Sequence, residues 1–307
     1  MNPDMAINTT ALRGTLKSNE PLSKHTSWRV GGVVARFYQP ADIDDLALFL
    51  SQLEKDEPIY WLGLGSNLLV RDGGYPGTMI CTSGVLGDLH FTDDEHVLVE
   101  AGVACPKVAR QCAKQGLSGA EFLCGIPGTM GGALAMNAGA FGGETWDIVE
   151  SVLTLDRSGQ RHERLPKEFD ISYRHVEGLQ DEWFVAATLK LAKGNKQQSQ
   201  DKIKQLLAKR GSSQPTQQPN AGSVFRNPEG DYAARLIESC GLKGTCIGGA
   251  CVSDRHANFI VNTGTATAND IETLMEKIAA TVKQECDVTL VREVCIVGDH
   301  LEQTGVS

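Results

Sequence analysis

Short stretches of alternating or continuous apolar residues recur along the chain and predict β-strands. They are rich in Val, Ile, Phe and Tyr, and most of them end at Gly, Asn, Asp or Ser, as strands do where a turn follows. Over residues 147–165, two such stretches flank Arg157, Ser158 and Gly159, which predicts a hairpin that turns at these residues. The other predicted strands are 34–39, two strands within 59–74, 78–82, 96–102, 183–194, 258–262 and 288–298.

Apolar residues at helical spacing predict amphipathic helices between these strands. In 41–55 and 268–285 they recur every three or four residues, so each helix has one face for the core. A helix with Pro106 in its first turn is predicted to end near Gly116, and another is predicted over 231–241. Helices and strands are mixed without strict βαβ alternation, so the predicted fold class is α+β.

A change in composition divides the chain into two parts. Residues 194–220 combine a short polar helix with a linker rich in Ser, Gln and Pro. A chain of 307 residues commonly holds two domains. We therefore predict one domain over 20–195, composed of two subdomains, and a second domain over 196–307.

The balance of charges limits the partners of the protein. Its 29 Lys and Arg residues against 38 Asp and Glu residues give a formal net charge of −9. Nucleic-acid-binding proteins usually carry a basic face, so we expect no nucleic-acid partner, although a local basic pocket for an anionic small molecule stays open. The first 30 residues lack the apolar core of a signal peptide, so we expect a cytoplasmic protein. Residues 1–15 also lack an apolar pattern, so we expect the protein to tolerate their deletion.

Nine cysteines are spread over the chain, and none of them forms a CxxC pair. Their spacings do not match those of zinc sites, so we predict no metal site. We expect the cysteines to be small buried residues of a protein in a reducing compartment.

An uncharged run covers residues 122–143 and contains seven glycines. A membrane-spanning helix is one interpretation, but Pro127, Asn137 and the glycines disfavour it, and we expect no membrane association. A glycine-rich loop, which lets a ligand approach the backbone closely, agrees better with this composition. A second glycine-rich segment, 63–67, matches neither a P-loop nor a complete Rossmann fingerprint. It is either a structural turn or, together with the first run, a cradle for a pyrophosphate.

Seven sequence motifs occur in an order that resembles one enzyme family. They are GLGSNLLVRDGG, EFLCGIPGTMGGALAMNAGAFGGE, ISYR, NAGSVFRNPEGDYAARLIE, GLKG, HANFIVN and REVCIVG. Over residues 20–300 the chain resembles the UDP-N-acetylenolpyruvoylglucosamine reductases, in the shorter type II form. The resemblance implies an FAD-binding domain of the vanillyl-alcohol-oxidase type, followed by a smaller substrate-binding domain.

The resemblance also implies a reaction and its cofactors. NADPH would reduce a non-covalently bound FAD, which would then reduce the enolpyruvyl ether of UDP-N-acetylglucosamine in peptidoglycan precursor synthesis. A hydride would go to C3 of the ether and a proton to C2. The residues implied to hold FAD are Gly63, Leu64, Gly65, Ser66, Asn67, Leu68, Ile126, Pro127, Thr129, Gly131, Gly132 and Asn137.

Three residues match the catalytic positions of the family. Arg174 would bind the substrate carboxylate, Ser223 would protonate C2 as a general acid, and Glu293 would assist from the last strand. Without the resemblance, they would be interpreted as a surface ion pair, a turn serine and an exposed strand glutamate. The family pattern differs at Val176, Cys251 and Cys295, the last of which is predicted to lie on the same strand face as Glu293.

The substrate-binding positions follow from the same resemblance, although His256 could equally be a core or surface histidine. We expect the protein to be a monomer. The residues implied to bind substrate are Tyr173, Arg210, Asn227, Lys243 and His256.

Two alternatives to this enzyme remain, namely another FAD oxidase or dehydrogenase of the same fold with a different acceptor, and a non-catalytic protein that has kept the fold.

Overall fold

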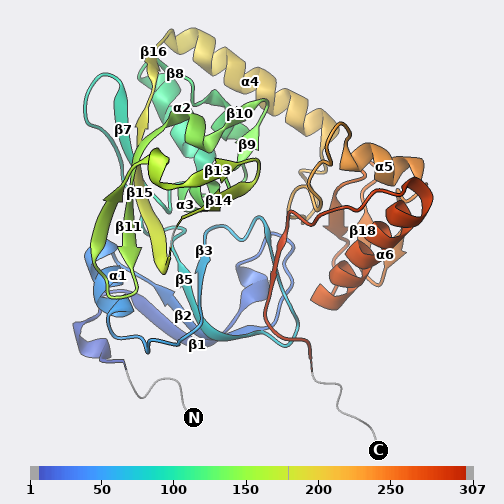
Figure 1. Ribbon diagram of the computed structural model, residues 1–307, viewed down its shortest axis with the longest axis horizontal. Helices are drawn as coiled ribbons and strands as arrows, with labels where there is room; N and C mark the ends of the chain where they lie inside the picture. Colours follow the sequence, from blue (N-terminus) through green and yellow to red (C-terminus); the bar gives the residue numbers. More distant parts are fainter. Residues whose placement is uncertain (1–6, 179, 302–307) are drawn as a thin grey trace, which may run out of the picture. The chain divides into compact units, whose positions relative to one another are not determined.

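The computed structural model describes residues 7–178 and 180–301, which divide into two compact units (Figure 1). The first unit comprises the described residues of 1–17, 36–64 and 77–210, and the second those of 18–35, 65–76 and 211–307. The chain passes from one unit to the other within three strands, β1 (Thr15–Pro21), β2 (Val33–Gln39) and β5 (Tyr75–Cys81).

These three strands belong to a four-stranded sheet of order β1-β2-β5-β3, in which β3 (Ile59–Leu62) runs parallel to β5. Helix α1 (Ile43–Leu50) belongs to the first unit and buries Leu46, Phe49 and Leu50 in the same core as Tyr38. It is shorter than the predicted 41–55, because the Asp42 side chain caps its first turn and Ser51 ends it.

A five-stranded antiparallel sheet forms the centre of the first unit, in the order β12-β11-β15-β7-β6. Helices α2 and α3 lie against it (Figure 1), and the cluster between them contains Val97, Val108, Leu134 and Leu189. The elements are β6 (Leu89–Phe91), β7 (His96–Glu100), α2 (Cys105–Lys114), α3 (Met130–Ala135), β11 (Val149–Asp156), β12 (Arg161–Arg164) and β15 (Glu182–Lys190).

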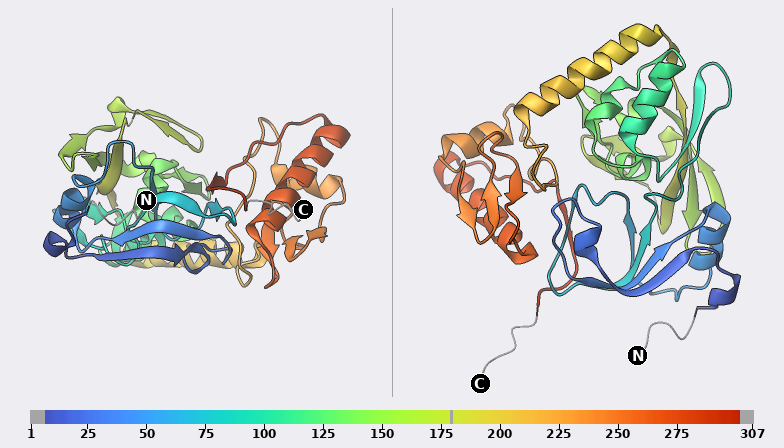
Figure 2. Two further views of the ribbon diagram at one scale, coloured as in Figure 1. Left: turned by 90° about the horizontal axis from the view of Figure 1, so that it is seen from below. Right: turned by 180° about the vertical axis from the view of Figure 1, so that it is seen from behind.

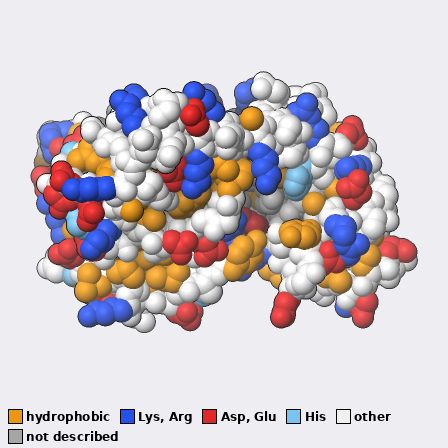
Figure 3. All heavy atoms as spheres, turned by 90° about the horizontal axis from the view of Figure 1, so that it is seen from above, with side chains coloured by type: hydrophobic (Ala, Val, Ile, Leu, Met, Phe, Trp, Pro, Cys, Tyr) orange, Lys and Arg blue, Asp and Glu red, His pale blue; other side chains and the backbone are white. Residues whose placement is uncertain are grey.

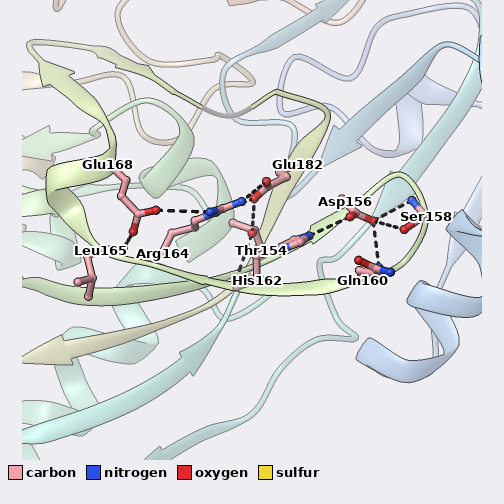
Figure 4. Close-up of polar contacts among 9 residues, drawn as sticks. All are labelled: Thr154, Asp156, Ser158, Gln160, His162, Arg164, Leu165, Glu168 and Glu182. Carbon is pink, nitrogen blue, oxygen red and sulfur yellow. Dashed lines mark hydrogen bonds and ion pairs between the residues drawn. The ribbon is translucent and has the colours of Figure 1, made fainter.

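The predicted hairpin is confirmed as β11–β12, and Figure 4 shows the polar contacts at its turn. Asp156 accepts hydrogen bonds from the backbone N–H of Ser158 and of Gln160, at 2.8 and 3.0 Å, and lies 2.8 Å from His162 Nε2. Burial opposes ionisation of Asp156, but the hydrogen bonds, that of His162 foremost, outweigh it and lower its pKa to about 2.

Short elements complete the first unit. Helix α4 (Lys196–Ser213) begins in this unit and ends in the second, and it is an 18-residue helix where a short one was predicted. Its four Lys, four Gln, two Leu and one Ala are residues that favour a continuous helix. The remaining elements are η2 (Thr9–Ala11), β8 (Leu117–Ser118), η4 (Glu121–Gly125), β9 (Gly139–Ala140), β10 (Gly143–Glu144), η5 (Thr145–Ile148), η6 (Pro166–Glu168), β13 (Asp170–Ser172), β14 (His175–Glu177) and β16 (Ala192–Lys193).

The second unit has a core of its own around a three-stranded sheet, β17-β18-β19. Helix α6 packs against β17 and β18, and α5 packs against α6 (Figure 2). A capping box between Thr267 and Asp270 fixes the start of α6. The elements are η3 (Leu22–Lys24), β4 (Leu68–Val70), α5 (Ala233–Ser239), β17 (Cys246–Ile247), β18 (Ala250–Val252), β19 (Ile260–Asn262), α6 (Ala268–Cys286) and β20 (Cys295–Val297), which pairs parallel with β4.

Three predictions from the sequence are wrong in part. The glycine-rich run 122–143 contains η4 and α3 where a loop was predicted. The predicted strand 288–298 is regular only over β20, because Arg292 forms an isolated bridge with Phe225 instead. The cysteines are not all buried thiols: Cys246 and Cys251 form a disulfide, since the β17–β18 register sets them opposite each other. Those that are buried as expected are Cys81, Cys105, Cys112 and Cys124.

Contacts of residues 7–15 argue against the expected tolerance to deletion of residues 1–15. Residues 1–6 lie outside the described residues, but Ile7 is buried in the core around Tyr38. Arg13 donates its backbone N–H to Asp45 Oδ1 at 2.8 Å. Residues 7–15 therefore belong to the packed structure.

The described residues contain no helix that is both long and apolar enough to cross a membrane. On the face drawn in Figure 3, Lys and Arg side chains are interspersed with Asp and Glu side chains. The net negative charge is therefore not gathered into a single patch on that face.

Candidate active site

The first unit contains a cradle of backbone between Gly63, at the end of β3, and Thr129, at the start of α3. A Cβ at Gly63 would lie 2.4 Å from Thr129 Oγ1, so no larger residue fits without displacing that side chain. Thr129 is 2% exposed, and no described group hydrogen-bonds its Oγ1. A buried hydroxyl that no described group hydrogen-bonds, next to a closely approached glycine, fits a bound polar group such as FAD offers.

The backbone amides of the two residues that follow Thr129 are hydrogen-bonded within the protein. Met130 and Gly131 donate their N–H groups to the carbonyls of Val103 and Ala101, each at 2.9 Å. A Cβ at Gly131 would lie 2.9 Å from Ala101 Cβ, so this glycine permits close packing of α3. Its amide is therefore used within the protein.

Three of the predicted FAD-binding residues, Leu64, Pro127 and Gly132, are exposed to solvent, whereas Ile126 is buried. The large apolar side chain of Leu64 is 44% exposed. Exposed apolar surface with few side chains suits a flat aromatic ring system such as that of a flavin.

The segment 63–67 crosses from the first unit to the second between Leu64 and Gly65. Gly65 has φ +59°, and a Cβ there would lie 2.1 Å from the His25 carbonyl oxygen. Ser66 is partly exposed and Leu68 is buried. In the second unit, these residues therefore form a tight turn that leads into β4.

Arg174 occupies the two-residue turn between β13 and β14, where its φ is +56°. Its guanidinium donates to the carbonyls of Gly139 and Asn137 at 3.1 and 3.4 Å. The guanidinium carbon lies 4.8 Å from the centre of the exposed Tyr173 ring. The structure thus aligns Arg174 by three contacts within the first unit.

The side chain of Asn137 hydrogen-bonds the hairpin that carries this turn. It is buried at φ +44°, and its side-chain Nδ2 donates to the Ser172 carbonyl at 3.1 Å and to Glu144 Oε2 at 2.8 Å. Its Oδ1 accepts from the Trp146 N–H at 3.2 Å. The amide is therefore engaged by protein groups and joins the Arg174 hairpin to α3, which the sequence alone did not indicate.

Ser223 and Glu293 come together in the second unit, although they are 70 positions apart in the sequence. The backbone N–H of Glu293 donates to the Val224 carbonyl at 2.8 Å, and Arg226 N–H donates to the Val291 carbonyl at 2.8 Å. Ser223 and Glu293 are both partly exposed, while Val224 between them is buried. The buried pairing therefore fixes both residues at the surface of the same core.

Two asparagines hold these paired segments. Asn258 is 3% exposed; its Oδ1 accepts from the Phe225 N–H at 3.0 Å, and its Nδ2 donates to the Phe225 carbonyl at 2.8 Å. Asn67 Nδ2 donates to the Glu293 carbonyl at 3.0 Å, and the Asn67 carbonyl accepts from Cys295 N–H at 3.0 Å. Asn258 is not among the site residues predicted from the sequence, although its place in the family motif HANFIVN was a signal that could have indicated it.

The predicted substrate contacts lie in different surroundings. Asn227 Oδ1 accepts from the N–H of Ala233, the first residue of α5, at 3.1 Å. Lys243 Nζ lies 2.7 Å from Glu238 Oε1. Arg210 belongs to the first unit, where burial lowers the pKa of its guanidinium, which still stays charged.

His256 lies in the second unit beside Phe259, with the ring centres 4.6 Å apart. Burial, followed by the positive charge of Lys243, lowers its pKa and favours the neutral imidazole. Its Nδ1 is buried, and no described group hydrogen-bonds it. His256 is thus an apolar-facing histidine close enough to sense the charge of Lys243.

The predicted site residues therefore form two sets. The first unit contains the Gly63–Thr129 cradle and Arg174, and the second contains Ser223, Glu293 and the residues around Lys243. Across the described ranges, no group of three or more His, Cys, Asp or Glu side chains is arranged to hold a metal ion.

Comparison with known proteins identifies both parts of the chain. A model of an FAD binding domain matches residues 34–163, and a model of the UDP-N-acetylenolpyruvoylglucosamine reductase C-terminal domain matches residues 214–297. A UDP-N-acetylenolpyruvoylglucosamine reductase of Legionella pneumophila (strain Lens) is 58% identical over 296 residues, which are 96% of each chain. The reductase of Methylococcus capsulatus is 58% identical over 94% of each chain.

A solved structure gives the same result. The crystal structure of UDP-N-acetylenolpyruvylglucosamine reductase from Thermus caldophilus superposes with a TM-score of 0.80 at 33% sequence identity. The match covers 94% of this chain and all of that one.

Proposed function

Because the chain belongs to the UDP-N-acetylenolpyruvoylglucosamine reductase family, we propose that Arg174, Ser223 and Glu293 carry out the reaction of that family here. The enzyme is a flavin-dependent oxidoreductase with FAD as its cofactor and NADPH as its reductant. It reduces the enolpyruvyl ether of UDP-N-acetylglucosamine to UDP-N-acetylmuramate in peptidoglycan precursor synthesis.

The first unit would hold FAD through the cradle between Gly63 and Thr129. When bound there, FAD would supply the hydride chemistry of the reaction. Thr129 Oγ1 would gain the hydrogen-bond partner that it lacks among the described residues. Leu64, Pro127 and Gly132 would cover the apolar ring and exclude water from it.

Arg174 would bind the substrate carboxylate. A guanidinium binds a carboxylate through two parallel hydrogen bonds and stays charged at every physiological pH. It would stabilise the negative charge that spreads from C2 into the carboxylate after hydride addition. Its contacts with the carbonyls of Gly139 and Asn137 orient it before substrate binds, so less rotamer freedom is lost on binding.

Ser223 would give its hydroxyl proton to C2. A serine hydroxyl is a weak acid, so this transfer needs groups nearby that orient it and stabilise the alkoxide. The observation that supports this assignment is the 2.8 Å hydrogen bond from Glu293 N–H to the Val224 carbonyl, which pairs the backbone of Glu293 with the residue that follows Ser223. Glu293 would orient the hydroxyl and help to return its proton.

The remaining assignments belong to the same proposal. Residues 20–195 would form the FAD-binding domain and 196–307 the substrate-binding domain, which would contact the UDP-sugar. The protein would act as a cytoplasmic monomer, without a nucleic-acid or membrane partner. The residues that would contact the UDP-sugar are Tyr173, Arg210, Asn227, Lys243 and His256. The remaining FAD contacts would be Gly65, Ser66, Asn67, Leu68, Ile126, Gly131 and Asn137.

Anaerobic visible spectroscopy tests the function in one cuvette. NADPH should bleach the yellow protein, and the enolpyruvyl UDP-sugar should restore the colour. A protein that bleaches but does not regain its colour with this substrate would have a different acceptor, as another FAD oxidase or dehydrogenase of this fold has.

The Ser223→Ala variant tests the acid. It should bleach with NADPH at the wild-type rate but regain its colour about 10²–10⁴-fold more slowly, as loss of a general acid predicts. Ser239→Ala, in the same unit but on helix α5, is the matched control and should behave as wild type. Recovery of Ser223→Ala at the wild-type rate would contradict the assignment.

A further inference from the structure

The second unit contains a disulfide that joins two neighbouring strands. Strands β17 and β18 pair antiparallel, and their register sets Cys246 directly opposite Cys251. The bonded residues are five positions apart in sequence, and their Cα atoms are 4.1 Å apart. The bond therefore closes a loop that the hairpin turn already closes.

The turn of this hairpin is fixed by packing, independently of the sulfurs. A Cβ at Gly248 would lie 2.4 Å from an Asp270 carboxylate oxygen, and one at Gly249 would lie 2.2 Å from the Ala266 nitrogen. Because these contacts do not depend on the bond, the thiols should stay opposite each other after reduction. In the chain-entropy account, a disulfide stabilises least when its loop is short, so stabilisation of the fold explains this bond poorly.

Solvent reaches this bond from one side. Cys246 is exposed and Cys251 is partly exposed. Thiol–disulfide exchange requires access of a thiolate to a sulfur, and Cys246 provides that access. By contrast, four cysteines of the first unit are buried, namely Cys81, Cys105, Cys112 and Cys124.

The bonded hairpin continues directly into the segment that carries Lys243. Gly244 N–H donates to the Val252 carbonyl at 3.1 Å, and Val252 N–H donates to the Thr245 carbonyl at 2.9 Å. Cys246 Sγ lies 3.4 Å from the Gly244 carbonyl oxygen. A disulfide sulfur has no proton, so this contact can become a hydrogen bond only when the bond is reduced. Reduction thus changes the contacts of the residue next to Lys243.

We propose that Cys246 and Cys251 form a reversible thiol–disulfide site, opened by small-molecule thiols, that sets the affinity of the enzyme for its UDP-sugar. The effect on affinity rests on the proposed role of Lys243 at the diphosphate. The hairpin stays closed in both states, but the reduced Cys246 thiol can hydrogen-bond the Gly244 carbonyl and so displace the backbone next to Lys243, which weakens affinity for that anion.

Two small-molecule thiols reduce the disulfide in two steps. The thiolate of a small thiol such as glutathione attacks the Cys246 sulfur, the Cys246–Cys251 bond breaks, and Cys251 leaves as a thiolate that takes a proton. A second glutathione thiolate attacks the mixed disulfide, which releases Cys246 as a thiol and forms oxidised glutathione. Two electrons pass from two glutathione molecules to the protein, and oxidised glutathione reverses both steps.

Peptide mapping of the FAD-loaded enzyme tests the site itself. Trypsin cuts after Lys243 and Arg255, so both cysteines fall in one peptide, 244–255. The enzyme is equilibrated in glutathione buffers of increasing reduced-to-oxidised ratio, treated with iodoacetamide and digested. We expect the peptide to pass reversibly from an unalkylated, bonded form to a doubly alkylated form. A peptide that stays in one form across the whole series would overturn the proposal.

Kinetics in the same buffers test the effect on affinity. The KM for the UDP-sugar should rise about three- to tenfold in the reduced enzyme, because the new contact of the Cys246 thiol displaces the backbone next to Lys243. Bleaching of the flavin by NADPH should be unchanged. Equal KM values in both states would overturn the link to affinity.

Two double variants make the test specific. Cys246→Ser/Cys251→Ser should have the higher KM in every buffer. Cys240→Ser/Cys286→Ser removes a second pair in the same unit, whose sulfurs are 3.7 Å apart and not bonded, and should respond as wild type. A redox response that is lost in this second variant instead would reassign the site and refute ours. An enzyme that never accepts the UDP-sugar would refute the proposed function, while the peptide map would still test the disulfide.

Discussion

Replacing Asn258 with alanine should destabilise the second unit and disturb the proposed acid. The substitution removes two hydrogen bonds, one to the N–H and one to the carbonyl of Phe225, at 3.0 and 2.8 Å. Phe225 is 1% exposed, so water cannot easily replace either partner. A buried polar group left without a partner costs about 1–3 kcal/mol, so we expect a loss of about 2–4 kcal/mol in the free energy of unfolding.

The loss should also reach the chemistry, because Phe225 is two positions from Ser223. Urea denaturation followed by circular dichroism measures the stability of Asn258→Ala. Stopped-flow absorbance measures bleaching by NADPH and recovery with the UDP-sugar separately. We expect bleaching at the wild-type rate and recovery slowed about tenfold or more, since small displacements of a catalytic group are costly.

Asn262→Ala is the matched control for this experiment. Asn262 is also buried in the second unit, and its Nδ2 donates to the Trp28 carbonyl at 2.8 Å. Its loss should cost comparable stability but leave recovery of the flavin colour near the wild-type rate. The reasoning would be refuted if both variants slowed recovery equally, or if Asn258→Ala lost less than about 1 kcal/mol.

Three further predictions concern the first unit. Gly63→Ala should weaken FAD binding about tenfold or more, measured by flavin absorbance after dialysis, because the added Cβ overlaps Thr129 Oγ1. Asp156→Asn should cost at most about 2 kcal/mol at pH 7. The pKa of Asp156 lies at about 2, below its usual 3.8. The contribution of the ionised carboxylate to the stability of the fold is therefore complete above about pH 4 and is lost as pH falls through about 2. The urea midpoint of the wild type should fall over this pH range, and that of the variant should lack this fall. Deleting residues 7–15 should lower the melting temperature by several degrees, since it removes Ile7 from its core; an unchanged melting temperature would contradict this.

The sequence predicted most elements where local signals decide them. The hairpin that turns at 157–159 has Asp156 just before the turn and Ser158 and Gly159 within it, and α2 has a proline near its start and a glycine after its end. The predicted bounds of an element were wrong where residues far away in the sequence decide where it begins or ends. The region before β20 pairs with the segment around Phe225 instead of continuing a regular strand, and nothing in its own residues indicates this.

The site was predictable as a set of residue types but not as a set of contacts. Glycines at 63 and 131 indicated close backbone approach, and in the structure each faces a side chain that a larger residue would have to displace. The roles of Asn67 and Asn258 depend on partners 226 and 33 positions away. The disulfide depends on strand register, since a shift by one residue would set the two cysteines on opposite faces.

Each set of candidate residues is oriented by contacts inside its own unit. Arg174 is held by carbonyls of the first unit, and Ser223 and Glu293 are held by backbone pairing in the second. Effects of substitutions at sites that share no partners are usually additive. Substitutions around Asn258 should therefore leave the flavin cradle and the Arg174 hairpin unchanged. For this reason, separate measurement of the two half-reactions can assign a defect to one unit.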